Sequence, residues 1–286
     1  MSNRLPCHLY SWPISLHSEA EMESGIVLVM SGAVAGLLGG MFGIGGSVVL
    51  VPILLYFFEF QGVTSQIVPH LAMGTSLATI LVTNGISSIS HHRRGHVDWP
   101  TVLSLSFFTG IGAQIGAFLA GRMDGVVLKP LLGTFQIFLG AMMWIRSDEN
   151  PASHAPPARL LYAGAGTGIG LVSSLFGIGG GTLMVPFLVR GLGQPIKTAI
   201  GCASVQGVVI ALSGTIGFVI QGLQHPQLPL GAWGYVSVPS ALWITIGSGM
   251  TAWWGAILSH KIPVNTLRRL LALLIMIVGT RLSGAW

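Results

Sequence analysis

The pentapeptide FGIGG occurs twice in this chain, at Phe42–Gly46 and at Phe176–Gly180, each time five residues before a Val-Pro pair. Glycine is the residue at which a helix breaks most easily. The half-helix after such a break presents unpaired N–H groups and the positive end of its dipole, and such an end binds small anions. The candidate binding residues are the glycines and the residue after each cluster: Gly43, Gly45, Gly46, Ser47, Gly177, Gly179, Gly180 and Gly181.

The segments around the clusters are too long to cross a membrane as single straight helices. Residues 24–58 and 160–189 carry no charged side chain. As helices they would span about 52 and about 45 Å, against a hydrocarbon core of roughly 30 Å. A break in the membrane leaves backbone groups that lipid cannot satisfy, so it is tolerated where those groups line a cavity or meet a ligand. We predict a broken or re-entrant helix in each segment.

Some glycines fit a simpler role, because small residues let membrane helices pack closely. We assign this packing role to Gly32, Gly36, Gly112 and Gly116.

Neutral polar side chains form a second group of candidates. They gather in AMGTS (Ala72–Ser76), in AIGCA (Ala199–Ala203) and in the residues after each motif. All eight acidic residues lie outside the predicted spans, so the interior offers no carboxylate for a cation. Hydroxyl and amide groups suit a small anion, although each taken alone fits helix packing equally well. The candidates in this group are Thr75, Ser76, Asn84, Cys202 and Ser204.

Other kinds of chemistry fit the chain less well. SHHRRGHVDW (Ser90–Trp99) reads as a basic loop beside the membrane rather than a metal site. Gly43-x-Gly45-Gly46 lacks the third glycine and the strand–helix unit of a dinucleotide fingerprint. An intramembrane hydrolase needs acids or metal ligands inside the bundle, where only His70 and His225 come near. We predict no enzyme activity, no metal, no cofactor and no nucleic-acid partner.

The composition places these motifs in a membrane protein. A soluble domain carries about 25% charged residues. In this chain of 286 residues, 7% are charged, 51% are hydrophobic, and the mean hydropathy is +0.76. The alternating polarity of membrane strands is absent. We therefore predict an all-α, polytopic membrane helix bundle, in which QGLQHPQLPLG (Gln221–Gly231) is a loop that divides the longest uncharged stretch.

The two FGIGG segments belong to a longer internal repeat. Gly36 and Gly170 are 134 residues apart, as are Pro52 and Pro186. AMGTS and AIGCA are 127 apart, and Gly-Ala pairs near the end of each half are 139 apart. We predict two homologous repeats, 24–145 and 160–286, joined by a polar linker, 146–159. Residues 1–23 are expected to be a tail, since their acids argue against a signal peptide.

The basic residues favour three net crossings in each half. If each broken segment enters and returns on one side, nine of the 13 Lys and Arg residues gather on one side of the membrane. If each segment crosses instead, the two sides hold six and seven. The positive-inside rule favours the first arrangement, and an odd number of crossings makes the two repeats inverted.

The doubled glycine segment, the AMGTS helix, HHRRGHVDW, and the pair GAFLAGRM and GAILSHKI resemble the TauE/SafE family of sulfite exporter-like membrane transporters. This resemblance implies a secondary transporter, an exporter, of a small sulfur-containing oxyanion such as sulfite or an organosulfonate. It also implies a multi-pass protein of the bacterial inner membrane. By position it points to the two glycine clusters and to Thr75, Ser76 and Cys202. Ser47 and Cys202 depart from the family pattern, so we expect unequal half-sites.

Two alternatives remain open at this stage. One is a passive anion channel, and the other, which fits less well, is an intramembrane hydrolase. The expected partners are the anion and the lipid bilayer, and the oligomeric state stays open.

Overall fold

The computed structural model of the chain describes all residues except 1–13, 43–45, 146–158, 224, 259–263 and 285–286. The first half forms α1 (Ile14–Phe42), α2 (Ser47–Phe60), α3 (Val68–Arg93), α4 (Trp99–Arg122) and α5 (Gly125–Ile145). The second half forms α6 (Arg159–Leu175), α7 (Gly181–Pro186), the π-helical turn η1 (Phe187–Gly191), α8 (Ile196–Gly222), α9 (Val238–Leu258) and α10 (Val264–Leu282).

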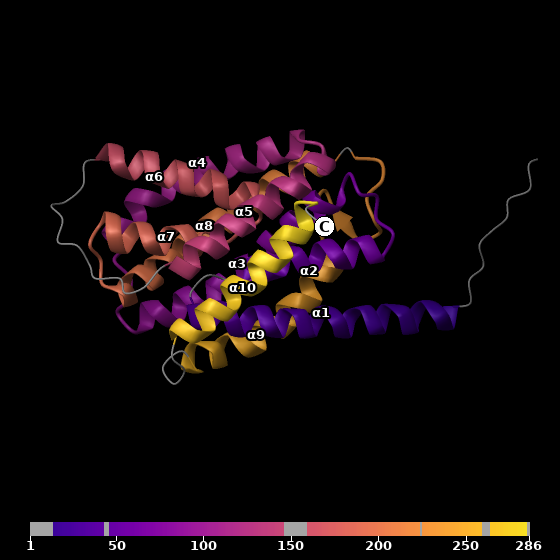
Figure 1. Cartoon of the computed structure of the whole chain (residues 1–286), viewed down its shortest axis with the longest axis horizontal. Helices are drawn as coiled ribbons and strands as arrows, with labels where there is room; N and C mark the ends of the chain where they lie inside the picture. The colour runs from indigo at the N-terminus through magenta and orange to yellow at the C-terminus, as the bar shows by residue number, and fades with distance from the viewer. Residues whose placement is uncertain (1–13, 43–45, 146–158, 224, 259–263, 285–286) are drawn as a thin grey trace, which may run out of the picture.

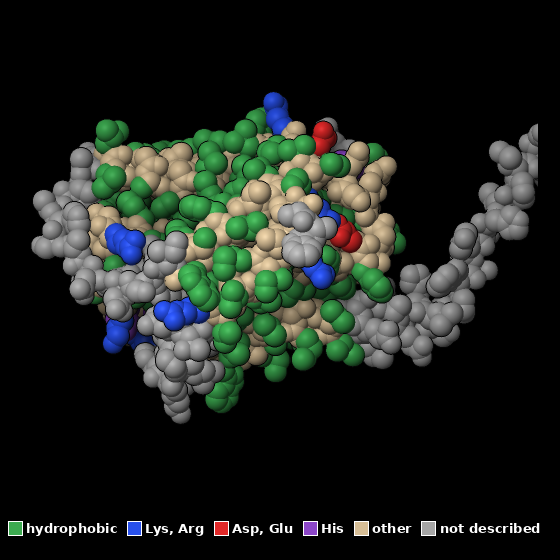
Figure 2. All heavy atoms as spheres, viewed as in Figure 1, with side chains coloured by type: hydrophobic (Ala, Val, Ile, Leu, Met, Phe, Trp, Pro, Cys, Tyr) green, Lys and Arg blue, Asp and Glu red, His purple; other side chains and the backbone are tan. Residues whose placement is uncertain are grey.

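The predicted all-α membrane bundle is confirmed. Within the described residues, four helices are long and apolar enough to cross a membrane: α3, α4, α8 and the Gly125–Trp144 part of α5. Figure 2 shows hydrophobic side chains across the middle of one face and Lys and Arg groups toward its ends. A lipid-facing belt between two polar ends has this distribution.

Both predicted helix breaks are present at FGIGG. α1 ends at Phe42 and α2 begins at Ser47, and Gly46 between them has a φ of 68°. In the second half Gly180, with a φ of 72°, precedes α7. Glycine adopts such positive φ values without the penalty that other residues suffer. Gly43 and Gly45 lie outside the described residues.

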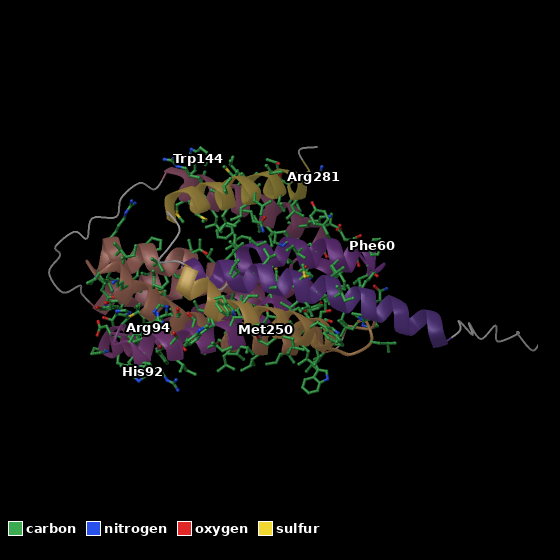
Figure 3. The ribbon with its side chains drawn as sticks, turned by 90° about the horizontal axis from the view of Figure 1, so that it is seen from below. Phe60, His92, Arg94, Trp144, Met250 and Arg281 are labelled. Atoms are coloured by element: carbon green, nitrogen blue, oxygen red, sulfur yellow. The ribbon has the colours of Figure 1, made fainter. Side chains whose placement is uncertain are left out.

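The first broken segment enters the bundle and returns. Phe60, at the end of α2, lies at the right end in Figure 3, the end from which α1 enters. Gly46 packs directly on α1, since a Cβ built on it would lie 1.9 Å from the carbonyl oxygen of Ala35. The chain has therefore turned back along α1 by Gly46.

The helices pack in pairs, and each of these pairs has one helix from each half of the chain. α1 packs along α9 and α6 along α4, while α3 packs on α8 and α5 on α10. A Cβ built on the four predicted packing glycines would lie 2.1 to 2.4 Å from a backbone oxygen of the partner helix. The packing role is thus confirmed for Gly32, Gly36, Gly112 and Gly116. Figure 1 shows α1 and α6 beginning at opposite ends of the bundle; their inversion in a membrane stays a prediction.

Some element boundaries differ from those expected. α1 begins at Ile14, inside the segment expected to be a tail. The loop at Gln221–Gly231 is followed by a short hairpin of β1 (Ala232–Trp233) and β2 (Val236–Ser237), which the sequence did not reveal. Strands of two residues carry too little periodicity to be detected in a sequence.

Candidate functional site

The two halves of the chain meet at the second break. Ser47, the first residue of α2, is fully buried, and its hydroxyl accepts a hydrogen bond of 3.1 Å from the N–H of Gly179. Ser76 on α3 donates a hydrogen bond of 3.1 Å to the carbonyl of Gly177. Ser47 and Ser76 both come from the first half, so the predicted residues of both halves are brought together here.

The turn at the second break pairs its own N–H groups. Gly180 donates to the carbonyl of Ile178 at 2.8 Å, and Gly181 donates to the carbonyl of Gly179 at 2.9 Å. Together with the Gly179–Ser47 bond, these contacts occupy three of the N–H groups expected to bind an anion. The reason is that buried N–H groups need partners in a membrane, and the turn and the other half supply them. The expectation of unpaired backbone donors was wrong at these three residues.

Side chains offer the unsatisfied donors instead. Asn84 on α3 is 2% exposed, and its Nδ2 atom has no hydrogen-bond partner among the described residues. This nitrogen lies 3.2 Å from the position of a Cβ on Gly179 and 2.1 Å from that of a Cβ on Gly207. A buried amide without a partner costs about 1 to 3 kcal/mol, so its presence asks for an explanation.

Three hydroxyl groups without a partner among the described residues belong to residues that flank the same turn in the chain. They belong to Ser173 and Ser174 at the end of α6 and to Thr182 on α7, and all three residues are buried. Ser173 Oγ lies 3.7 Å from the position of a Cβ on Gly180. The second break thus has unsatisfied polar groups from α3 and α6 beside it, and Thr182 follows it in α7, whereas the Ser174 hydroxyl lies 2.6 Å from the position of a Cβ on Gly214 of α8.

These three hydroxyls are not among the site residues expected from the sequence, although they differ from the equivalent residues of the first repeat. Ser173 and Ser174 stand where the first half has Gly39 and Gly40, 134 residues earlier, and Thr182 stands where it has Val48. These three hydroxyls are therefore present beside the second break only, whereas Ser47 beside the first break corresponds to Gly181 in the second half. This asymmetry agrees with the expectation of unequal half-sites.

A cavity lies beside Asn84 between α1, α3 and α9. Its α3 side is polar, whereas its α1 side consists of glycines. α3 ends at Arg93, two residues beyond His91 in the cavity lining, and Figure 3 shows His92 and Arg94 at that end of the bundle. A basic end attracts anions by its electrostatic field. The polar lining consists of Thr83, Asn84, Ser87, Ser90 and His91.

Three predicted residues do not face the second break. The hydroxyl of Thr75 accepts a hydrogen bond of 2.9 Å from the N–H of Ser237. The thiol of Cys202 lies 3.3 Å from the N–H of Asp98. Ser204 donates to the carbonyl of its own helix, at Ile200, at 2.9 Å.

Three charged side chains of the described residues, Glu59, Lys129 and Asp98, make polar contacts away from the turn. Glu59 pairs with Lys129, and the Asp98 carboxylate accepts hydrogen bonds from Thr101 and Gln194. Across the part of the chain that the structure describes, no three His, Cys, Asp or Glu side chains come together as a metal site. The groups gathered at the second break are neutral donors, which can bind an anion without holding it as an ion pair.

Comparison with known proteins indicates a membrane transporter family. The chain matches the sequence model of the family described as "Sulfite exporter TauE/SafE" over residues 28–282. A protein of Haemophilus influenzae named "Probable membrane transporter protein" is 33% identical over 255 residues, which cover 89% of this chain and 96% of that protein. "Probable membrane transporter protein YunE" of Bacillus subtilis is 25% identical over 277 residues, which cover 91% and 97%.

A third relative, from Methanocaldococcus jannaschii and also named a probable membrane transporter protein, is 27% identical over 254 residues, 88% of this chain and 93% of its own. No solved structure gives a significant match. The family match extends over nearly all the described helices, including both breaks. This chain is therefore a membrane protein that belongs to the TauE/SafE sulfite exporter family.

Proposed function

We propose that this protein is a secondary transporter that exports a small sulfur-containing oxyanion, such as sulfite or an organosulfonate, across the bacterial inner membrane. The observation that carries the proposal is the buried, unsatisfied amide of Asn84 beside the second break, together with the hydroxyls of Ser173 and Thr182. The family description and the names of the relatives support transport, and the family description also suggests the class of substrate.

The chemistry of the substrate fits these groups. An oxyanion presents several acceptor oxygens, and the Asn84 amide and the two hydroxyls are donors without partners among the described residues. Binding would make hydrogen bonds that the empty protein lacks, and these offset part of the anion's lost hydration. Because the donors are neutral, the anion is not trapped by a strong ion pair and can leave, as transport requires.

The route to the site follows from charge and polarity. The cavity beside Asn84 extends along α3 toward its basic C-terminal end, with Ser87, Ser90 and His91 in its lining. In the proposal, anions collect at the basic end, pass along these polar side chains, and bind beside the second break. The positive-inside rule assigns the basic end to the cytoplasm, so uptake at this end leads to export.

The test is substrate binding and counterflow with purified protein in liposomes, using labelled sulfite and methanesulfonate. Asn84→Leu removes the amide donor at similar size, and Ser173→Ala removes a hydroxyl that has no hydrogen-bond partner within the described part of the chain. Each should weaken binding about 10- to 100-fold, the usual range for one hydrogen bond to a charged group.

The matched control is Ser213→Ala. It also removes a hydroxyl inside the bundle, but that hydroxyl donates to the carbonyl of Gly110 on α4 at 2.9 Å. This variant should keep wild-type affinity. If Asn84→Leu and Ser173→Ala both bind sulfite and methanesulfonate like the control, the proposed site is wrong. Accumulation of substrate against its gradient distinguishes a coupled transporter from a passive channel.

A further inference from the structure

The β1–β2 hairpin lies on the first turns of α3. A Cβ built on Gly74 would be 2.1 Å from the carbonyl oxygen of Tyr235, so the hairpin backbone touches the helix backbone. The next residue, Thr75, accepts the hydrogen bond from Ser237 N–H described above, at 2.9 Å. The ring of Tyr235 stacks on His70, with ring centroids 4.8 Å apart. Gly74 and Thr75 therefore form a seat for residues 232–237.

The loop between α3 and α4 makes the same two contacts on α8. A Cβ built on Gly201 would be 2.0 Å from the carbonyl oxygen of His96. The next residue, Cys202, has its sulfur 3.3 Å from the N–H of Asp98. Gly201 and Cys202 therefore form a second seat, which holds residues 94–98.

The two arrangements are equivalent in the repeat. Gly74 and Gly201 are 127 residues apart, as are Thr75 and Cys202. On the loops, His96 and Tyr235 are 139 apart, as are Asp98 and Ser237. Equivalent pairs thus make equivalent contacts, each between one half and the other. The two seats are at opposite ends of the bundle, because α3 begins at the right end in Figure 1 and α8 at the left.

We propose that the loops 94–98 and 232–237 are the two gates of the transporter and that both are closed in this structure. With both closed, the second break and Asn84 lie buried between the two seats. The two seats share a glycine in backbone contact and one hydrogen bond, and each loop makes a few further contacts: Tyr235 stacks on His70 and donates to the carbonyl of Phe218, and Asp98 accepts from Gln194. Releasing a loop breaks these contacts. A substrate that binds the released state better can supply that difference. That a small sulfur-containing oxyanion passes these gates rests on the proposed function.

Two disulfide locks test the inference. The first joins Thr75→Cys to Ser237→Cys in a chain that also carries Cys7→Ser and Cys202→Ser. The second joins the native Cys202 to Asp98→Cys in a Cys7→Ser chain. Each lock, verified by mass spectrometry, should abolish transport, and a reductant should restore it. The matching single-cysteine variants, treated with the same oxidant, are the controls and should keep their untreated rate.

A reporter cysteine provides a readout that needs no substrate. The reporter is Ser173→Cys, since Ser173 is buried beside the second break. After the lock has formed, this cysteine is treated with a membrane-impermeant thiol reagent in intact cells and in inverted vesicles. Each lock should remove labelling from its own end only. Conversely, Gly201→Ala should raise labelling from the Arg94 end roughly tenfold, because its methyl group collides with the loop. Gly85→Ala on α3, with open space around the added methyl, should leave labelling unchanged.

Locked protein that still transports, with labelling from both sides unaffected, would show that the loops are static and would overturn the inference. If each lock removes labelling from its own end but the protein binds no sulfur oxyanion, the gates are established and the proposed substrate is refuted.

Discussion

At the scale of single residues, Ser47 and Asn84 lie at the same turn with opposite roles. The Ser47 hydroxyl already accepts from Gly179, whereas the Asn84 amide has no partner among the described residues. Ser47→Ala should therefore lower the stability of the folded protein by about 1 to 3 kcal/mol, because the buried N–H of Gly179 loses its acceptor. Thermal unfolding in detergent measures this. Ser31→Ala, which removes an exposed hydroxyl bonded within α1, is the control and should change stability little. Equal stabilities for the two variants would contradict a stabilising hydrogen bond between Ser47 of the first half and Gly179 of the second.

The neutral donors also predict which anions pass. The cost of moving an ion out of water rises with the square of its charge, and hydrogen bonds from an amide and hydroxyls offset only part of it. Methanesulfonate, a monoanion, should therefore exchange at least tenfold faster than sulfate, a dianion of similar size. Counterflow at one pH with the two labelled anions tests this. Sulfate exchange as fast as that of methanesulfonate would mean that a positive charge takes part in binding.

At the scale of helices, the α1–α9 seam is held by backbone contact. A Cβ on Gly32 would lie 2.2 Å from the carbonyl oxygen of Ile244, and one on Gly247 would lie 2.0 Å from that of Val29. Even alanine is too large here, so Gly32→Ala should cost about 1 to 3 kcal/mol of stability through overpacking. Thermal unfolding with Gly85→Ala as control tests the prediction, since that methyl group meets open space and helix propensity favours alanine. A Gly32→Ala protein as stable as the control would show that the seam is loose.

At the scale of the whole molecule, the ends of the bundle differ in charge. Figure 3 shows His92, Arg94 and Trp144 at one end and Phe60 and Arg281 at the other. The loops at the first end carry most of the chain's basic residues, so we infer that this end is cytoplasmic and that the two halves are inverted.

Single-cysteine labelling with an impermeant reagent tests this topology. In a chain that lacks Cys7 and Cys202, Phe60→Cys, at a residue 92% exposed, should react in intact cells. His92→Cys should react only in inverted vesicles. Reaction of both from the same side would exclude the inverted arrangement.

The sequence by itself determined the features that depend on composition and local pattern. Few charges and long apolar runs require a membrane protein. A glycine cluster in a segment too long for one crossing requires a break, and the breaks at Gly46 and Gly180 have nearly the same geometry. The packing role of Gly32 and Gly116 and the membership of the family also followed from pattern. These features need no knowledge of which way a side chain points.

Only the tertiary structure decided which polar groups surround the second break. Successive residues of a helix point about 100° apart, so neighbours in the sequence meet different partners. Thr75 receives a hydrogen bond from the hairpin while Ser76 bonds to the second break. The N–H of Gly179 is satisfied by Ser47, a residue 132 positions away, and no local pattern shows such a pairing. The candidate site therefore shifted from backbone donors to Asn84 and the hydroxyls near it, because among the described residues those groups are without partners, whereas the N–H groups of Gly179, Gly180 and Gly181 are paired.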